Sequence, residues 1–185
     1  MQLTEKNNEP DWVALCRKGD NSAFTALYNK YAKRVFNSIC RVIPHTAEAE
    51  DILQESFYHA FSDIHRLQNP SSFGAWVSRI AINRAISHLR RQKVSFLDAD
   101  EIEVADEPPE DEETAQLFEC TVDEVRNAIS QLPTGYRTIL SLYLFEDMNQ
   151  EEIARMLGVS HSTVRTQYHR AKKKVLQLLK NKTWS

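Results

Sequence analysis

A chain of 185 residues with only 4 glycines and 6 prolines is long enough for one large or two small domains and favours regular secondary structure. It has no run of about 18 apolar residues, and its first residues, MQLTEKNNEPDW, lack the apolar stretch of a signal peptide. We therefore exclude membrane insertion and expect a cytoplasmic protein. The 3 cysteines, Cys16, Cys40 and Cys120, are far apart, which predicts reduced thiols and neither a disulfide nor a metal site.

The net charge of −3 conceals a segregation of charge along the chain. Residues 1–93 hold 13 Lys and Arg against 9 Asp and Glu, and residues 125–185 hold 10 against 4. Residues 94–124 hold 13 Asp and Glu and no Lys or Arg, and they include Pro108-Pro109. Repelling like charges and prolines without an N–H predict an extended, flexible linker over residues 94–120. This linker is either a solvated tether or a segment that mimics nucleic acid or threads a basic channel of a partner.

The first basic block has the periodicity of helices throughout. The short segment 11–19, DWVALCRKG, should form a helix that ends at Gly19. In residues 21–43 the apolar side chains recur every three or four positions, which places them on one helical face. Asp20 or Asn21 is the expected N-cap of this long helix. Its apolar stripe comprises Phe24, Leu27, Tyr28, Tyr31, Val35, Ile39 and Val42.

The next helix, AEAEDILQESFYHAFSDI, should begin after a cap at Thr46 and carries an acidic face. Leu53 and Phe57 belong to its apolar stripe, whereas Asp51, Gln54 and Glu55 lie on the other side. An acidic helix face is either simply solvated or a surface that docks on another protein. Catalysis by these acids is not expected, because no His, Cys or other nucleophile lies at a complementary helical position.

A helix over residues 72–93, SFGAWVSRIAINRAISHLRRQK, becomes more basic along its length. Aromatic side chains beside basic and amide side chains are what a surface needs to neutralise phosphates and hold unpaired bases. The alternative for the two aromatic residues is packing in the core. The candidate nucleic-acid contacts of this helix are Phe73, Trp76, Arg79, Asn83, Arg84, Arg90 and Arg91.

The six histidines do not indicate a metal site. His59 and His65 are six positions apart, His161 and His169 are eight apart, and none has another histidine at the i, i+4 spacing of helical ligands. We therefore expect no metal and no other cofactor.

The segment QEEIARMLGVSHSTVR, within residues 150–165, predicts a helix-turn-helix. Gly158 takes the corner, where a residue without a Cβ adopts positive φ without strain, and Ser160 caps the second helix. That helix buries the stripe that contains Val164 and Ala171. Its other face is polar and basic and suits a DNA major groove. The residues of that face are Ser162, Arg165, Thr166, His169 and Lys173, with Arg170 beside them.

The fold class predicted from these patterns is all-α. Two small helical domains, residues 1–93 and 121–185, are joined by the acidic flexible linker, and the C-terminal domain contains the helix-turn-helix. Two further helices around Leu132-Pro133 should support it within residues 121–148.

Several segments, in this order, resemble the extracytoplasmic-function sigma factors of bacterial RNA polymerase. They are GDNSAFTALYNKYAKRVF, AEDILQESFYHAF, SSFGAWVSRIAINRAISHLRRQK, the acidic linker, and AISQLPTGYRTILSLYLFEDMNQEEIARMLGVSHSTVRTQYHRAKKK. The resemblance covers nearly the whole chain. It implies a protein that binds core RNA polymerase and directs initiation at promoters by recognising the minus-35 and minus-10 elements and assisting strand opening.

The resemblance also implies roles for the candidate residues. Asp51, Gln54 and Glu55 would dock on the clamp helices of the largest polymerase subunit. The set from Phe73 to Arg91 would open the minus-10 element and hold a flipped base, with Asn83 at a position where the family commonly has asparagine. The set from Ser162 to Lys173 would read the minus-35 element. The family's linker runs through the RNA exit path, and such proteins often have an anti-sigma factor as a partner.

One position departs from the family pattern, since many relatives carry a basic residue where this chain has Gln167. A glutamine that reaches a base favours adenine, and the alternative is that Gln167 faces phosphate or solvent.

The main alternative is a stand-alone helix-turn-helix transcriptional regulator that binds a palindrome as a dimer. That interpretation assigns no function to the acidic helix face or to the basic helix over residues 72–93. A nucleic-acid enzyme would need a catalytic constellation or a phosphate-binding glycine loop, and neither is found, so we expect no enzymatic activity.

Overall fold

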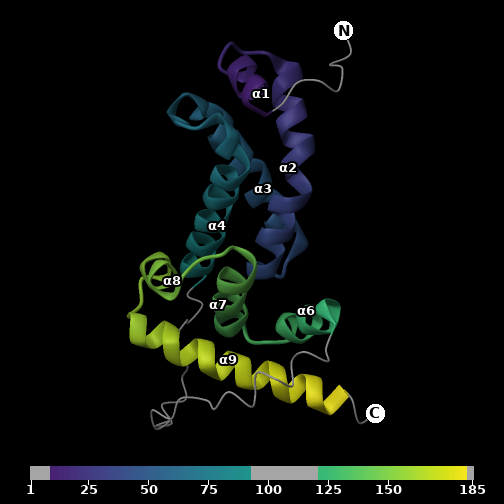
Figure 1. Ribbon diagram of the computed structural model, residues 1–185, viewed down its shortest axis with the longest axis vertical. Coiled ribbons are helices and arrows are strands. Elements are labelled where there is room, and N and C mark those ends of the chain that lie inside the picture. The colour runs from purple at the N-terminus through teal and green to yellow at the C-terminus, as the bar shows by residue number, and fades with distance from the viewer. Residues whose placement is uncertain (1–8, 93–120, 183–185) are drawn as a thin grey trace. The chain divides into compact units, whose positions relative to one another are not determined.

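A computed structural model of the chain describes residues 9–92 and 121–182. All regular elements in these two ranges are helices, which confirms the all-α fold class (Figure 1). The helices form two compact units, Met1–Leu89 and Arg90–Ser185. The predicted acidic linker, residues 94–120, lies outside the described residues. No helix in the described ranges combines the length and apolar character needed to cross a membrane.

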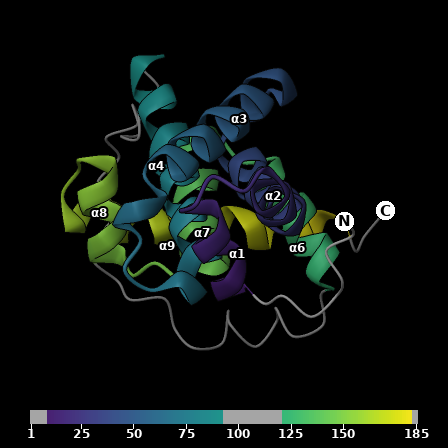
Figure 2. The ribbon, with the colours of Figure 1, turned by 90° about the horizontal axis from the view of Figure 1, so that it is seen from above.

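The first unit consists of one short α-helix and three long ones. Its α-helices are α1 (Glu9–Cys16), α2 (Asn21–Val42), α3 (Thr46–Ser62) and α4 (Phe73–Arg91), and two short 3-10 helices, η1 (Ile64–Arg66) and η2 (Pro70–Ser72), lie between α3 and α4. Helix α2 packs against α1 and against α3 (Figures 1 and 2).

Local capping chemistry sets the corner between α1 and α2. Gly19 has a φ of 83°, the Asp20 N–H donates to the Leu15 carbonyl at 3.1 Å, and the Gly19 N–H donates to the Cys16 carbonyl at 2.9 Å. This is the Schellman pattern, in which glycine takes the left-handed position at low cost. The Asp20 carboxylate then accepts the Ser22 and Ala23 N–H groups at 2.8 and 3.1 Å, which confirms Asp20 as the N-cap.

The start of α3 differs from the prediction. Thr46 is the first residue of the helix rather than its cap, and His45 occupies the cap position without a side-chain hydrogen bond. His45 has extended backbone and the helix begins at Thr46, one residue too early for Thr46 to act as the cap.

An aromatic cluster fills the first unit between α2, α3 and the start of α4. Phe73 is fully buried and stacks on Phe61 with ring centroids 5.9 Å apart. The Tyr31 ring lies 5.8 Å from Phe73 on another side. Next to Phe73, a Cβ built at Gly74 would lie only 2.4 Å from Cε1 of Tyr31. Glycine at position 74 therefore lets the Tyr31 ring approach the α4 backbone.

Replacing Gly74 by alanine should destabilise the first unit by about 1–2 kcal/mol. The gain in helix propensity is at most about 1 kcal/mol, whereas displacing a packed ring costs about 1–3 kcal/mol. Amide hydrogen exchange of α2 and α4 measures this change. In a Tyr31→Ala background the same substitution should become neutral or stabilising. Equal costs in both backgrounds would contradict the contact.

The second unit is built on one long helix. Its helices are α6 (Val122–Ser130), α7 (Thr134–Phe145), α8 (Gln150–Leu157) and α9 (His161–Lys182), and α9 packs against the other three. Thr121 forms a capping box with Glu124 at the start of α6, and Pro133 precedes α7, so the predicted break at Leu132-Pro133 is confirmed.

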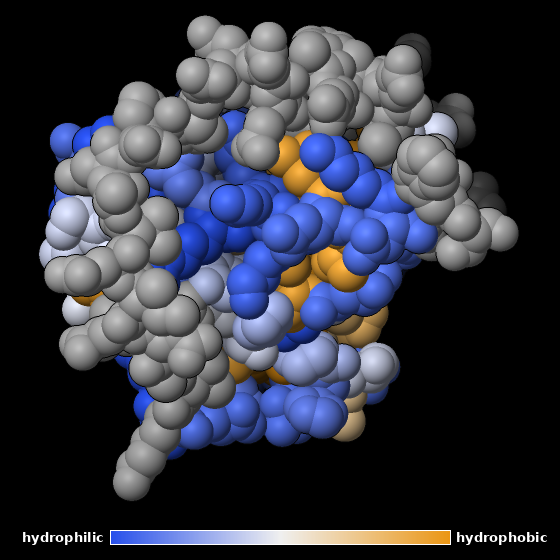
Figure 3. Space-filling model, turned by 90° about the horizontal axis from the view of Figure 1, so that it is seen from below, coloured by the Kyte–Doolittle hydropathy of each residue, from blue (hydrophilic) through white to orange (hydrophobic). Residues whose placement is uncertain are grey.

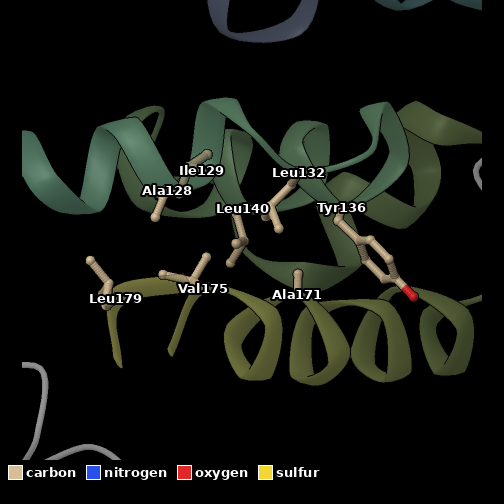
Figure 4. Packing of buried hydrophobic residues seen from close by; sticks show 8 residues of the cluster. All are labelled: Ala128, Ile129, Leu132, Tyr136, Leu140, Ala171, Val175 and Leu179. Carbon is tan, nitrogen blue, oxygen red and sulfur yellow. The ribbon is translucent and has the colours of Figure 1, made fainter. Parts of the chain in front are cut away.

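The core of the second unit joins α6, α7 and α9. One face of α9 presents small and branched apolar side chains to the other two helices (Figure 4). The cluster consists of Ala128, Ile129, Leu132, Tyr136, Leu140, Ala171, Val175 and Leu179. Burying this face of α9 leaves its opposite face for another contact.

Candidate nucleic-acid interface

Helices α8 and α9 form the predicted helix-turn-helix. Asn149 and Glu152 form a reciprocal capping box at the start of α8, with hydrogen bonds of 2.9 and 3.1 Å. Gly158 ends α8 with a φ of 70°, and Ser160 Oγ accepts the Thr163 N–H at 3.0 Å at the start of α9. The predicted roles of Gly158 and Ser160 are confirmed. The turn is fixed by local hydrogen bonds, so the direction of α9 relative to α8 is set.

The outer face of α9 is polar and basic. Among the residues predicted to lie there, Ser162, Arg165, Thr166 and Lys173 are exposed. His169 and Arg170 are half-buried. Hydrophilic residues dominate the side of the molecule on which α9 lies, with smaller apolar patches between them (Figure 3). Exposed positive charge on a helix that is rigidly held by an apolar core suits contacts with phosphates and base edges.

Gln167 does not belong to this face. Its side chain is only 5% exposed, so it faces neither solvent nor DNA in this structure. The apolar stripe of α9 is wider than the sequence pattern indicated, because Gln167 lies between the buried residues Val164 and Ala171. Base reading by Gln167 is therefore not supported.

His169 is more buried than the exposed residues of the same face. Its Nδ1 atom is buried without a hydrogen-bond partner, and its ring lies 5.8 Å from that of Tyr168. Burial lowers the pKa of His169, and the positive charges of Lys172 and Arg165 lower it further. His169 is thus held in the neutral form, in which a ring nitrogen is able to accept a hydrogen bond.

The stability of the second unit should fall in acid partly because of His169. The unfolded chain takes up the proton first as pH falls below about 6.5, so the stabilisation by neutral His169 is present above that pH and is lost as pH falls through the lowered folded pKa. His169→Gln should flatten this pH dependence, as measured by urea unfolding with hydrogen exchange of α9 between about pH 7.5 and 5. Thr166→Gln, an exposed substitution on the same helix that removes no ionisable group, provides the control and should leave the slope unchanged. A slope that His169→Gln does not alter would contradict the account.

Helix α4 presents a second basic face. Of the predicted residues, Arg79, Asn83, Arg90 and Arg91 are exposed, and Arg84 is half-buried. Arg79, Asn83 and Arg90 follow the helical repeat and therefore share one face with the exposed Ser87.

The two aromatic residues predicted to contact nucleic acid differ in position. Phe73 is 0% exposed and belongs to the aromatic core, so the structure places it behind the surface and not on it. Trp76 is half-buried, with its ring 6.1 Å from that of Phe73 in an edge-to-face arrangement. Phe73 therefore packs beneath the start of α4, and the Trp76 side chain remains partly accessible to solvent.

The acidic face of α3 is exposed as predicted. Asp51, Gln54 and Glu55 all point to solvent, and Tyr58 beside them is 70% exposed. Ile52, Ser56 and other residues of the opposite face are buried. The face is thus a carboxylate and amide surface with one exposed aromatic ring.

An ion pair and a hydrogen-bond contact join α3 to α4, which the sequence did not predict. Glu55 pairs with Arg84, and Glu48 contacts His88 Nε2 at 3.0 Å. The first pair brings together one residue from the predicted protein-docking set and one from the predicted DNA-binding set. A test that changes Glu55 therefore also changes the surroundings of Arg84.

Comparison with known proteins shows the class to which these faces belong. Residues 27–94 match the family model for Sigma-70 region 2, and residues 122–175 match that for Sigma-70, region 4. The first match covers α3 and α4, and the second covers the helix-turn-helix.

Relatives of similar length extend this match to nearly the whole chain. The RNA polymerase sigma-H factor of Pseudomonas aeruginosa is 32% identical over 182 residues, which is 94% of this chain and 94% of that protein. The ECF RNA polymerase sigma factor SigW of Bacillus subtilis is 28% identical over 177 residues, or 89% of this chain and 93% of that protein. The fold is similar to that of the sigma factor RpoE of Bartonella quintana, solved with the anti-sigma factor NepR, with a TM-score of 0.52, 19% identity and coverage of 85% and 96% of the two chains.

The chain belongs to the sigma-70 family, in its extracytoplasmic-function subfamily. It is a promoter-directing sigma factor and not a stand-alone helix-turn-helix regulator, because both sigma regions are present in order. Sigma factors of this family bind core RNA polymerase and promoter DNA.

Proposed function

We propose that three exposed helix faces have separate roles in promoter recognition. The acidic face of α3 docks on the clamp helices of the largest polymerase subunit, the basic face of α4 engages the opened minus-10 element, and the outer face of α9 reads the minus-35 element. The observation that carries this assignment is that each face is exposed while the opposite side of its helix is buried. Residues 1–93 would form the docking and minus-10 domain, 94–120 the linker, and 121–185 the minus-35 domain.

The docking face suits a basic protein surface. Asp51 and Glu55 supply charge, and Gln54 between them supplies an amide that donates and accepts hydrogen bonds. Tyr58 adds an exposed aromatic ring of the kind enriched at the centres of protein interfaces. Charge complementarity of this sort mainly sets partner choice and the rate of association.

The minus-10 face suits a separated DNA strand. Arg79, Arg90 and Arg91 neutralise phosphates, and the Asn83 amide is able to hydrogen-bond an unpaired base. Trp76 offers a partly exposed ring at the start of the same helix. The chain performs no chemistry in this scheme, since bond formation belongs to the polymerase, and it acts in the cytoplasm without a cofactor.

The minus-35 face suits duplex DNA. Arg165 and Thr166 lie in the first turns of α9, where a recognition helix places its base-reading residues. Ser162, His169, Arg170 and Lys173 extend the face along the groove. One such helix buries little surface, so specific binding requires both DNA-reading domains to be held together on the polymerase. An anti-sigma factor would act by covering one of these faces.

Arg165 and Lys173 give the sharpest test of the minus-35 assignment. With the holoenzyme on promoter DNA, Arg165→Ala should weaken binding by about 1–3 kcal/mol and relax discrimination at one base pair, whereas Lys173→Ala should weaken all sequences alike and reduce the salt slope by about 1. Lys180→Ala removes an exposed charge near the end of the same helix and serves as the control. The assignment fails if Arg165→Ala leaves both affinity and base preference unchanged.

A further inference from the structure

The loop between α3 and α4, residues 63–72, is shaped by its own hydrogen bonds. Ile64 and Leu67 point into the core, with 1% and 5% exposure. Asn69 accepts the Ser71 N–H at 3.1 Å through its side chain, and Ser72 Oγ donates to the Asn69 carbonyl at 2.7 Å. The buried side chains therefore anchor the loop, and its polar residues remain on the surface. The exposed residues are His65, Arg66, Gln68, Asn69 and Ser71.

Arg17, which follows α1, hydrogen-bonds to this loop. Its Nε atom donates to the Ile64 carbonyl at 3.4 Å, and its Nη2 atom donates to the Leu67 carbonyl. The Ile64 carbonyl also accepts the Leu67 N–H at 3.4 Å, which closes η1, and the Leu67 carbonyl belongs to the residue that follows η1. One guanidinium thus ties two points of the loop that are separated from it by 47 and 50 residues.

The backbone of Arg17 is itself fixed. Arg17 lies in the Schellman corner between α1 and α2, and its own N–H donates to the Val13 carbonyl at 3.1 Å. Val13 and Cys16, which precede it in and at the end of α1, are buried. The guanidinium therefore extends from a rigid backbone, and its hydrogen bonds connect the corner between α1 and α2 to the loop.

We infer that Arg17 is a positioning residue that keeps the loop 63–72 in the shape that receives an unpaired base of the minus-10 strand. The inference rests on the proposed function of α4, because the loop leads directly into Phe73 at the start of that helix. A loop that is already ordered loses little conformational entropy when it binds, whereas a loop without Arg17 must be ordered by the DNA. Arg17 itself touches no DNA in this account.

The test compares Arg17→Ala and Arg17→Lys with Lys18→Ala, which removes the exposed neighbouring charge. The full-length variants are assembled with core polymerase. The probe is a forked DNA with a duplex minus-35 element and an unpaired non-template minus-10 strand, taken from a promoter that the wild-type holoenzyme transcribes. A duplex that carries only the minus-35 element and the affinity for core polymerase are measured in parallel.

The expected result is a loss confined to the forked DNA. Arg17→Ala should weaken its binding about tenfold, Arg17→Lys should lose less, and Lys18→Ala should behave as wild type. Core affinity and duplex binding should not change, and hydrogen exchange should accelerate in residues 63–72 while α2 stays protected.

Two results would overturn the inference alone. One is wild-type binding of the forked DNA by Arg17→Ala. The other is an equal loss of core affinity and DNA binding, which would show that Arg17 only stabilises the unit. If the wild-type holoenzyme shows no preference for the unpaired strand, the proposed function of α4 fails, and the inference fails with it.

Discussion

Replacing Phe73 by alanine is expected to lower the free energy of unfolding of the first unit by about 3–5 kcal/mol. The ring is 0% exposed and contacts the rings of Tyr31, Phe61 and Trp76, so its removal leaves a cavity at the junction of α2, α3 and α4. Hydrogen exchange of the α2 and α4 amides measures the loss. DNA binding by this variant should fall only to the extent that the unit unfolds.

Tyr58→Ala is the matched control for this prediction. It also removes an aromatic ring, but that ring is 70% exposed, so the unfolding free energy should change by no more than about 0.5 kcal/mol. A stable Phe73→Ala protein that fails to bind minus-10 DNA would contradict the structure and restore Phe73 as a DNA contact.

Asp51→Arg is expected to weaken binding to core polymerase by at least about 30-fold. The substitution places a positive charge on an exposed acidic face that is proposed to meet a basic surface, and removing or reversing a charge at a hydrogen-bonded interface costs about 2–5 kcal/mol. Titration of labelled protein with core polymerase measures the affinity. Because Asp51 is exposed, the stability of the free protein should stay within about 0.5 kcal/mol of wild type.

Glu50→Arg makes the same charge change on the same helix but about 100° around its axis. Glu50 is exposed, lies near Cys40 of α2 and is at the edge of the docking face: it is one helical turn from Gln54 but about 100° around the axis from Asp51 and about 140° from Glu55. It should retain most of the affinity for core polymerase. Similar losses from Glu50→Arg and Asp51→Arg would show that overall charge, and not a defined face, governs docking. Glu55 is a poorer choice for this test because its change also removes the ion-pair partner of Arg84.

Most features fixed by neighbours in the sequence were predicted correctly, and the cap at Thr46 is the exception. The Asp20 cap, the positive φ of Gly158 and the Ser160 cap each depend on atoms within about five residues, so residue type and spacing were sufficient to find them. The exposed faces of α3 and α9 followed from the helical repeat in the same way.

Features that depend on packing between helices were missed. The helical repeat gives the direction of a buried stripe but not its width, which is why Gln167 was expected at a surface and Phe73 was left open between core and surface, whereas both are buried. The Glu55–Arg84 pair spans 29 residues, and the bonds from Arg17 to the loop span 47 and 50. Nothing local in the sequence marks such pairs, because their partners meet only after the helices have packed.

Run-off transcription tests the central claim most directly. Bacterial core polymerase is assayed with and without this protein on a pool of promoter fragments from its own genome, with Asp51→Arg as the docking variant and Glu50→Arg as its control. We expect discrete transcripts that require the protein, persist with Glu50→Arg and disappear with Asp51→Arg. The account is contradicted if core polymerase gains no new start sites while the protein alone still binds duplex DNA.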